Sequence, residues 1–180
     1  MTGRIRRWIT VLTLAVSLLA GSGAAQADDI KKAGDILRFA MPIFAGGYSL
    51  ARGDDDGLVQ FAKSFLVSSG IAFGLKKAIH EERPNHKDDE SFPSGHVVNA
   101  VSAASYLDHR YGWKFGLPSY LLAAFVGYSR VESHEHHVID VVGGAFLSWG
   151  VSHIFVTPLP IQAGAEIGRD RALLRISAQW

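Results

Sequence analysis

The hydrophobic and polar positions of this 180-residue chain alternate between long apolar segments and short charged ones. Five of the apolar segments have the length and periodicity typical of helices, and they cover residues 31–51, 58–80, 95–108, 117–128 and 136–155. We expect Gly46 and Gly47 to break the first of them. Pro84 ends the second region, because a residue before proline is pushed out of the helical conformation. The pattern predicts an all-α bundle of five to six helices.

The N-terminal region has the three parts of a secretory signal peptide. Three arginines lie within the first seven residues, an apolar stretch follows at residues 8–20, and Ala25-Gln26-Ala27 fits a cleavage site. Cleavage after Ala27 is the favoured interpretation, and an uncleaved membrane anchor, which would add a sixth helix, is the alternative. Both predict that the helical domain, residues 28–156, is exported to the periplasmic side.

Charged or polar residues interrupt the apolar segments of the mature chain, among them Arg38, Lys63, Asn99 and His153. No segment reaches the run of about 20 apolar residues that is typical of a membrane span. A compact helical bundle is therefore the first interpretation, and a bundle of short membrane-embedded helices is the second. The tail, residues 157–180, has no assigned role, and a packed terminus, a hairpin and an amphipathic membrane contact all fit it.

Composition excludes several classes of function. The formal net charge is +1, which gives no electrostatic footprint for nucleic acid. The chain has no cysteine, so disulfides and thiolate chemistry are excluded.

Three short stretches carry side chains suited to phosphate chemistry. The first is "KKAIHEERP", in which Lys76 and Arg83 are seven residues apart, nearly two helical turns, and are therefore expected to lie on one helix face. Lysine offers a point charge and arginine a planar fork for two phosphate oxygens. An ordinary basic helix end is the alternative for this stretch taken alone.

The second stretch is "SFPSGHVVNA". Ser94 is a good N-cap, and the free backbone amides that follow a cap form an anion pocket. Gly95 lets the backbone approach a ligand closely. His96 lies in the first helical turn, where an adjacent anion explains a histidine better than the helix dipole does. The alternative is an ordinary turn with an exposed histidine.

The third stretch is "YSRVESHEHHVIDVVGG". His136 and Asp140 are four residues apart, so the carboxylate can hold one ring nitrogen and leave the other as a nucleophile. Arg130 adds a second phosphate fork. A metal site made of His134, His136 and His137 with Asp140 is the alternative, although the chain offers no matched second cluster of ligands.

Together the three stretches resemble the three-part signature of the type 2 phosphatidic acid phosphatase and vanadium haloperoxidase superfamily. The matching pattern is Lys76-x6-Arg83-Pro84, then Pro93-Ser94-Gly95-His96, then Ser129-Arg130-x5-His136-x3-Asp140. The resemblance covers residues 76–140. Each stretch alone is weak, but the ordered set is specific.

The resemblance implies catalytic roles for three residues and phosphate binding for five. His136 would attack phosphorus and form a phosphohistidine, Asp140 would orient it, and His96 would protonate the leaving oxygen and then activate water. The phosphate-binding residues would be Lys76, Arg83, Ser94, Gly95 and Arg130. Such positioned cations neutralise the charge of a phosphoryl transition state, so no metal or other cofactor is expected.

The sequence therefore predicts an exported, metal-independent phosphatase that acts on a phosphorylated lipid or small molecule. Apolar residues around the signature, such as Phe92, Val97 and Tyr128, favour a lipid or isoprenoid phosphate. Three alternatives stay open: a soluble non-specific acid phosphatase, a vanadium-dependent haloperoxidase, and a non-catalytic metal- or membrane-binding protein.

Overall fold

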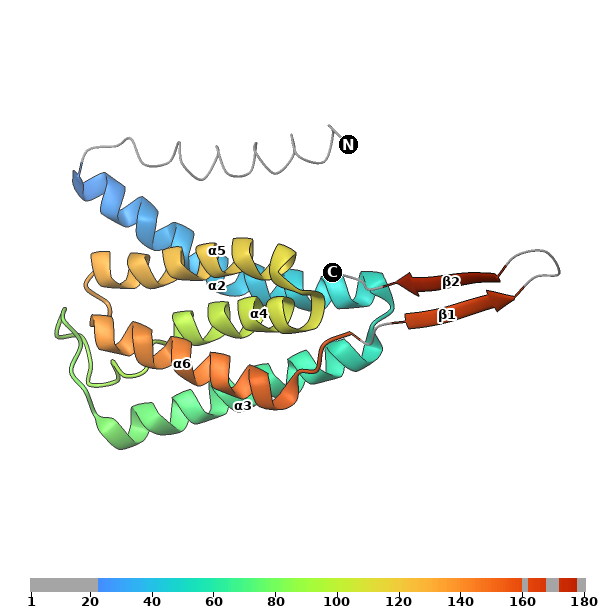
Figure 1. The fold of residues 1–180 in the computed structure, drawn as a ribbon. Coiled ribbons are helices and arrows are strands. Elements are labelled where there is room, and N and C mark those ends of the chain that lie inside the picture. The colour runs from blue at the N-terminus through green and yellow to red at the C-terminus, as the bar shows by residue number, and fades with distance from the viewer. Residues whose placement is uncertain (1–22, 160–161, 168–171, 178–180) are drawn as a thin grey trace.

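The computed structural model describes residues 23–159, 162–167 and 172–177 and contains five helices within them (Figure 1). The helices are α2 (Gly23–Arg52), α3 (Asp55–Ile79), α4 (Gly95–Tyr111), α5 (Trp113–Glu132) and α6 (Val138–Phe155). Of the predicted signal peptide, residues 1–27, the first 22 residues lie outside the described ranges, and the last five begin helix α2. The predicted all-helical bundle is confirmed.

Two expectations about the helices are wrong in detail. Helix α2 continues through Gly46 and Gly47, because packing against α3 stabilises it there: a Cβ at Gly46 would make ordinary contacts with Leu58 and Phe61. Helix α6 begins at Val138, two residues later than predicted, so His136 precedes the helix.

Helix α4 lies at the centre of the bundle and contacts α2, α3, α5 and α6. Its residues from Val97 to Leu107 are nearly all buried, and small side chains such as Ala100, Ala103 and Ala104 let the neighbouring helices approach closely. At its N-terminal end the approach of α6 is tighter still, since a Cβ at Gly144 would lie 3.0 Å from the carbonyl oxygen of Ser94. This contact holds the start of α6 against the loop that carries the second stretch of the signature.

The tail contains an antiparallel hairpin of β1 (Gln162–Ile167) and β2 (Ala172–Ser177), with Gln162 opposite Ser177 and Ile167 opposite Ala172. A strand at "ALLRIS" was one of the structures that the sequence allowed for this segment.

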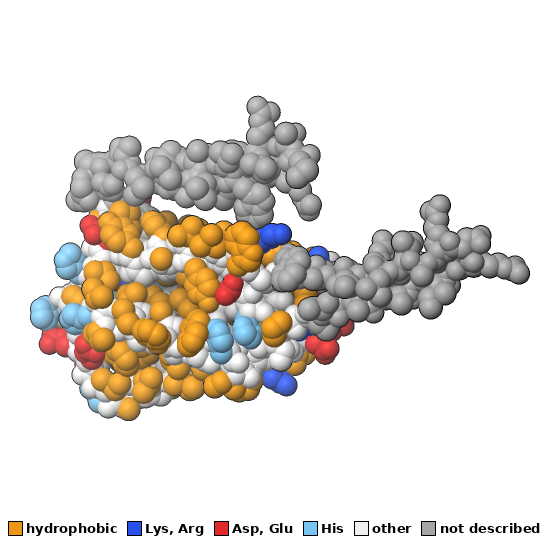
Figure 2. Space-filling model, in the orientation of Figure 1, with side chains coloured by type: hydrophobic (Ala, Val, Ile, Leu, Met, Phe, Trp, Pro, Cys, Tyr) orange, Lys and Arg blue, Asp and Glu red, His pale blue; other side chains and the backbone are white. Residues whose placement is uncertain are grey.

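Large apolar side chains are exposed on the outer faces of α2, α3, α5 and α6, and we call this surface the apolar belt. Figure 2 shows these side chains covering the flank of the bundle. The belt includes Ile36, Ile43, Leu66, Phe73, Leu121, Phe146 and Ile154. Helices α3 and α6 are long and apolar enough to cross a membrane, and fewer than a third of the residues in each apolar window are buried inside the bundle. An exposed apolar surface of this kind is typical of contact with a membrane or with a partner.

Candidate active site

The three stretches of the signature meet at one end of the bundle. The end of α3, the loop at residues 80–94, the start of α4, the end of α5 and the start of α6 converge there (Figure 1). Direct contacts connect Arg83 with His136, His136 with Asp140, and Arg130 with His96. The signature runs from Lys76 to Asp140, 64 positions later, and its residues form one polar cluster in the fold.

His136 is buried and has two distinct ring nitrogens. Its Nδ1 lies 3.3 Å from Oδ2 of Asp140 and 3.4 Å from the hydroxyl of Ser91, whereas Nε2 lies 3.4 Å from a guanidinium nitrogen of Arg83. Asp140 Oδ2 also accepts hydrogen bonds from the backbone N–H of His137 at 2.8 Å and from the hydroxyl of Ser91. The carboxylate is thus fixed beside Nδ1, which leaves Nε2 facing the cations.

The electrostatic surroundings keep the His136 ring neutral. Burial lowers the pKa of His136, and the positive charges of Arg83 and Lys76 lower it further, against the opposing effect of Asp140. A neutral ring with a free Nε2 lone pair is what a nucleophile requires.

Lys76 and Arg83 approach this ring from two different elements. Lys76 is in the last turn of α3 and donates to the carbonyl oxygens of Glu90 at 2.6 Å and Ser91 at 3.2 Å. Arg83 is in the following loop, where Asp88 accepts from its Nε at 2.6 Å and the Glu135 carbonyl from its Nη1 at 3.2 Å. The expected common helix face is therefore wrong, because α3 ends at Ile79. The loop turns Arg83 back toward the cluster instead.

His96 and Arg130 form the other side of the cluster together with helix α2. Arg130 is almost fully buried, and its Nη1 donates to Asp35 at 2.8 Å and lies 3.2 Å from His96 Nε2. His96 Nε2 is 2.7 Å from the same Asp35 oxygen. Burial together with the charges of Arg130 and Arg38 lowers the pKa of His96 to about 4, although Asp35 opposes this shift.

Ser94 and Gly95 lie between these two groups. Ser94 is at the N-cap position of α4, but the expected capping bond of its side chain is absent, and its buried Oγ has no partner. Its backbone N–H donates to the carbonyl of Asp140 instead, at 3.0 Å. Space beside Gly95 is open, since a Cβ there would meet nothing within 4 Å. An unpaired buried hydroxyl beside open space can serve a ligand.

Sequence reasoning missed the contribution of helix α2 and of Ser91. Asp35 and Arg38 contact His96, the backbone carbonyl of Lys31 accepts from Arg130, and Gly34 permits this by close approach to Ser129 and Arg130. The spacing of Lys31, Asp35 and Arg38 by four and three residues places them on one helix face and was a signal that could have found them. Ser91 carried no signal, because a serine in a polar loop is ordinary.

His134 and His137, which have no role in the predicted phosphatase and belong to the alternative metal site, are both exposed. Beside the cluster lies a cleft of about 380 Å³ that is lined by polar residues including Lys31, Asn85, Lys87, His134 and Glu135. Glu135 pairs with Lys31 at 2.5 Å and with Lys87 at 2.8 Å. Although burial alone would raise the pKa of Glu135, these two lysines lower it to about 2.

A buried histidine–aspartate pair, a second histidine and three cations form an arrangement that can hold a phosphoryl group. The comparisons with known proteins agree. The model of the PAP2 superfamily matches residues 57–160, more than half of the chain. The chain belongs to the PAP2 superfamily, so the resemblance seen in the sequence is confirmed, and the protein is a hydrolase of phosphoric esters.

Two relatives and one solved structure are similar to this chain. A lipid A 4'-phosphatase of Helicobacter pylori is 37% identical over 139 residues, which are 71% of this chain and 70% of that protein. A lipid A 1-phosphatase of Porphyromonas gingivalis is 30% identical over 91 residues, 49% of this chain but 20% of that protein. The crystal structure of Aquifex aeolicus LpxE has the same fold, with a TM-score of 0.53 and 20% identity over 67% of this chain and 83% of that one.

Proposed function

We propose that this protein is an exported, membrane-bound phosphatase that removes a phosphate group from the saccharide headgroup of lipid A through a phosphohistidine at His136. The His136–Asp140 pair, with Nε2 facing Arg83, is the observation that carries the proposal. The extent of the similarity to a lipid A 4'-phosphatase supports the substrate.

In the proposed first step, Nε2 of His136 attacks phosphorus and the bond from phosphorus to the sugar oxygen breaks. Asp140 stabilises the positive charge that the phosphorylated ring acquires. Lys76, Arg83 and Arg130 hold the phosphoryl oxygens, with Ser94 and the Gly95 amide as further donors. All of these groups come from the chain itself, so the reaction proceeds without a metal.

His96 supplies the proton that the leaving sugar oxygen needs. In the free enzyme, burial and the neighbouring cations Arg130 and Arg38 keep the pKa of His96 at about 4. A bound phosphate dianion neutralises Arg130 and Arg38 and so raises the pKa of His96 toward the value a general acid needs at neutral pH. In the second step His96 takes a proton from water, which attacks phosphorus and releases phosphate and His136.

The surroundings of the site fit a lipid with a large polar headgroup. The 380 Å³ cleft beside the cluster is polar and offers Lys31, Asn85 and Lys87 to sugar or phosphate groups. The apolar belt begins next to the same end, for example at Ile36 and Ile139, where acyl chains would lie. We place α3 and α6 across the membrane and the site at its periplasmic surface, because the predicted cleavage site after Ala27 lies near the start of α2, at the site end.

Phosphate release by the purified chain in the presence of a chelator tests this function. The substrates are lipid A, phosphatidic acid, phosphatidylglycerophosphate, an isoprenoid pyrophosphate and a soluble aryl phosphate, with His136→Ala as the control. We expect lipid A to have the highest kcat/KM, and mass spectrometry of the product to show which phosphate is removed. Equal rates on the soluble ester would favour the acid phosphatase alternative, and turnover that needs vanadate would favour the haloperoxidase.

A further inference from the structure

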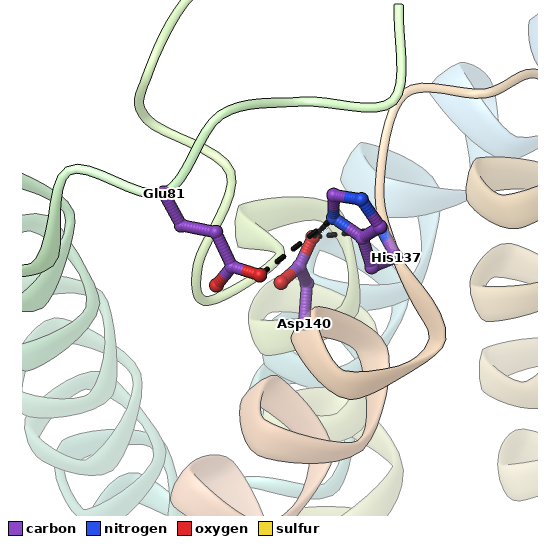
Figure 3. Close-up of side chains that lie close together, drawn as sticks. All are labelled: Glu81, His137 and Asp140. Atoms are coloured by element: carbon purple, nitrogen blue, oxygen red, sulfur yellow. Dashed lines mark hydrogen bonds and ion pairs between the residues drawn. The ribbon is translucent and has the colours of Figure 1, made fainter.

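One face of the site carries two side chains that the proposed reaction does not use, and both lie beside Asp140. Glu81, from the loop after α3, and His137, just before α6, converge on Asp140 (Figure 3). Nδ1 of His137 lies 3.7 Å from Oε1 of Glu81 and 3.7 Å from Oδ2 of Asp140. Asp140 is fully buried, whereas the Glu81 and His137 side chains are 32% and 45% exposed, so solvent reaches the cluster from the side of these two residues.

These distances are close to what a zinc ion requires. Zinc bonds of about 2.0–2.1 Å in a tetrahedral arrangement place neighbouring ligand atoms about 3.4 Å apart. The three ligand atoms lie within 4.8 Å of one another, and two of the three separations need to shorten by only a few tenths of an ångström. One imidazole and two carboxylates with a fourth position open to water form a common zinc ligand set.

A second observation concerns the other oxygen of the same carboxylate. Oδ1 of Asp140 is buried and has no hydrogen-bond partner, whereas Oδ2 is the oxygen that lies 3.7 Å from His137. Such an atom is rare in folded proteins, because a carboxylate oxygen loses its hydration without compensation. Figure 3 shows the carboxylate turned toward Glu81 and His137, where a cation would satisfy it.

We propose that Glu81, His137 and Asp140 form an inhibitory site for zinc. The ion would compete with His136 for the Asp140 carboxylate, whose Oδ2 lies 3.3 Å from the nucleophile's Nδ1. Neutralising this carboxylate removes the charge that stabilises the phosphorylated ring. Zinc should therefore lower kcat much more than it changes KM. Zinc binding depends on the three side chains alone, whereas the inhibition rests on the proposed function.

The test uses the full-length chain without a histidine tag, loaded with zinc in competition with a chromophoric chelator. Glu81→Gln and His137→Asn should each weaken zinc binding at least about tenfold, since even the loss of an outer-shell partner costs that much. Both variants should keep the metal-free activity and lose the inhibition. His80→Asn and His86→Asn are matched controls, because each ring pairs with a single exposed carboxylate, Asp89 or Glu82, and both should bind zinc and be inhibited as the wild type.

Cobalt absorption gives a readout that is independent of catalysis. A cobalt complex at this site should show the intense visible bands of four-coordinate geometry, and they should disappear in His137→Asn. Zinc affinity and cobalt spectra that are unchanged in Glu81→Gln and His137→Asn would overturn the site. Zinc bound there without a fall in kcat would overturn the inhibition. A chain that binds zinc as expected but hydrolyses no substrate in chelator would instead contradict the proposed function.

Discussion

The two ends of helix α4 each hold a buried polar cluster, and the clusters differ in whether their charged groups are satisfied. At the C-terminal end, Arg110 donates to both oxygens of Asp54, at 2.8 and 2.5 Å, and to the carbonyl of Thr157 at 2.9 Å. Tyr111 and the Gly57 amide complete the hydrogen bonds of Asp54. At the N-terminal end lies the candidate active site.

The cluster with satisfied groups stabilises the fold, whereas the cluster with unsatisfied groups serves function. Among the described buried side chains, the charged atoms without a partner are Arg38 Nε and Asp140 Oδ1, and both belong to the site end. A closed network such as that of Asp54 and Arg110 fixes the ends of helices against each other. An open one keeps donors and acceptors free for a ligand at a cost in stability.

Removing the nucleophile should have the largest effect. His136→Ala should lower kcat by at least about a thousandfold, since loss of a covalent nucleophile leaves only binding and electrostatic assistance. Asp140→Asn should be less severe, because the nucleophile remains. The melting temperature of His136→Ala should stay near that of the wild type. Phosphate release in chelator and thermal unfolding in detergent are the measurements, and wild-type turnover by His136→Ala would contradict the assignment.

A mutation in the cluster of Asp54 and Arg110 should change the stability of the protein rather than its activity. Asp54→Asn leaves Arg110 buried without its counter-charge, which costs roughly 3–5 kcal/mol in comparable pairs. Activity per folded molecule should be unchanged. The exposed neighbour Asp56→Asn is the control and should change the free energy of unfolding little. A stable Asp54→Asn variant that loses turnover would contradict the claim that this end of α4 serves stability and the other end serves catalysis.

Asp35 should behave as a positioning residue for the general acid. Asp35→Asn weakens its contacts with His96 and Arg130, so protonation of the leaving group should suffer by about a hundredfold. The loss should be large for a sugar or alkyl phosphate and small for a nitrophenyl phosphate, which needs no protonation. An equal loss on both esters would indicate that Asp35 has a merely structural role.

Removing the positive charge of Arg83 should shift the pH profile of the reaction as well as lower its rate. Arg83 and Lys76 help to lower the pKa of His136, so removing one positive charge favours the protonated ring and raises that pKa. The acid limb of kcat/KM should therefore move to higher pH in Arg83→Gln. Lys77→Gln, at an exposed lysine that pairs with Glu90, should leave the limb in place. A limb that stays or moves to lower pH in Arg83→Gln would show that another group controls it.

Sequence patterns predicted the bundle well because helical periodicity and the loops between segments are local properties. The signature also indicated which residues would meet, although it placed Lys76 and Arg83 on one helix. The contribution of α2 was missed because Asp35 reaches His96 only through tertiary packing, 61 positions away. The apolar belt was not predicted from the sequence, because the apolar runs are shorter than a typical membrane span. It was identified only from the buried and exposed faces of α3 and α6.

The most direct test of the central claim is to trap the covalent intermediate. In His96→Gln, a phosphate ester with a nitrophenolate leaving group should still phosphorylate the enzyme, while the slowed attack by water lets the intermediate accumulate. Mass spectrometry of the quenched enzyme should find one phosphate on the peptide that contains His136, stable in base and lost in acid. Release of nitrophenol with no adduct, or with an adduct on another residue, would contradict the account.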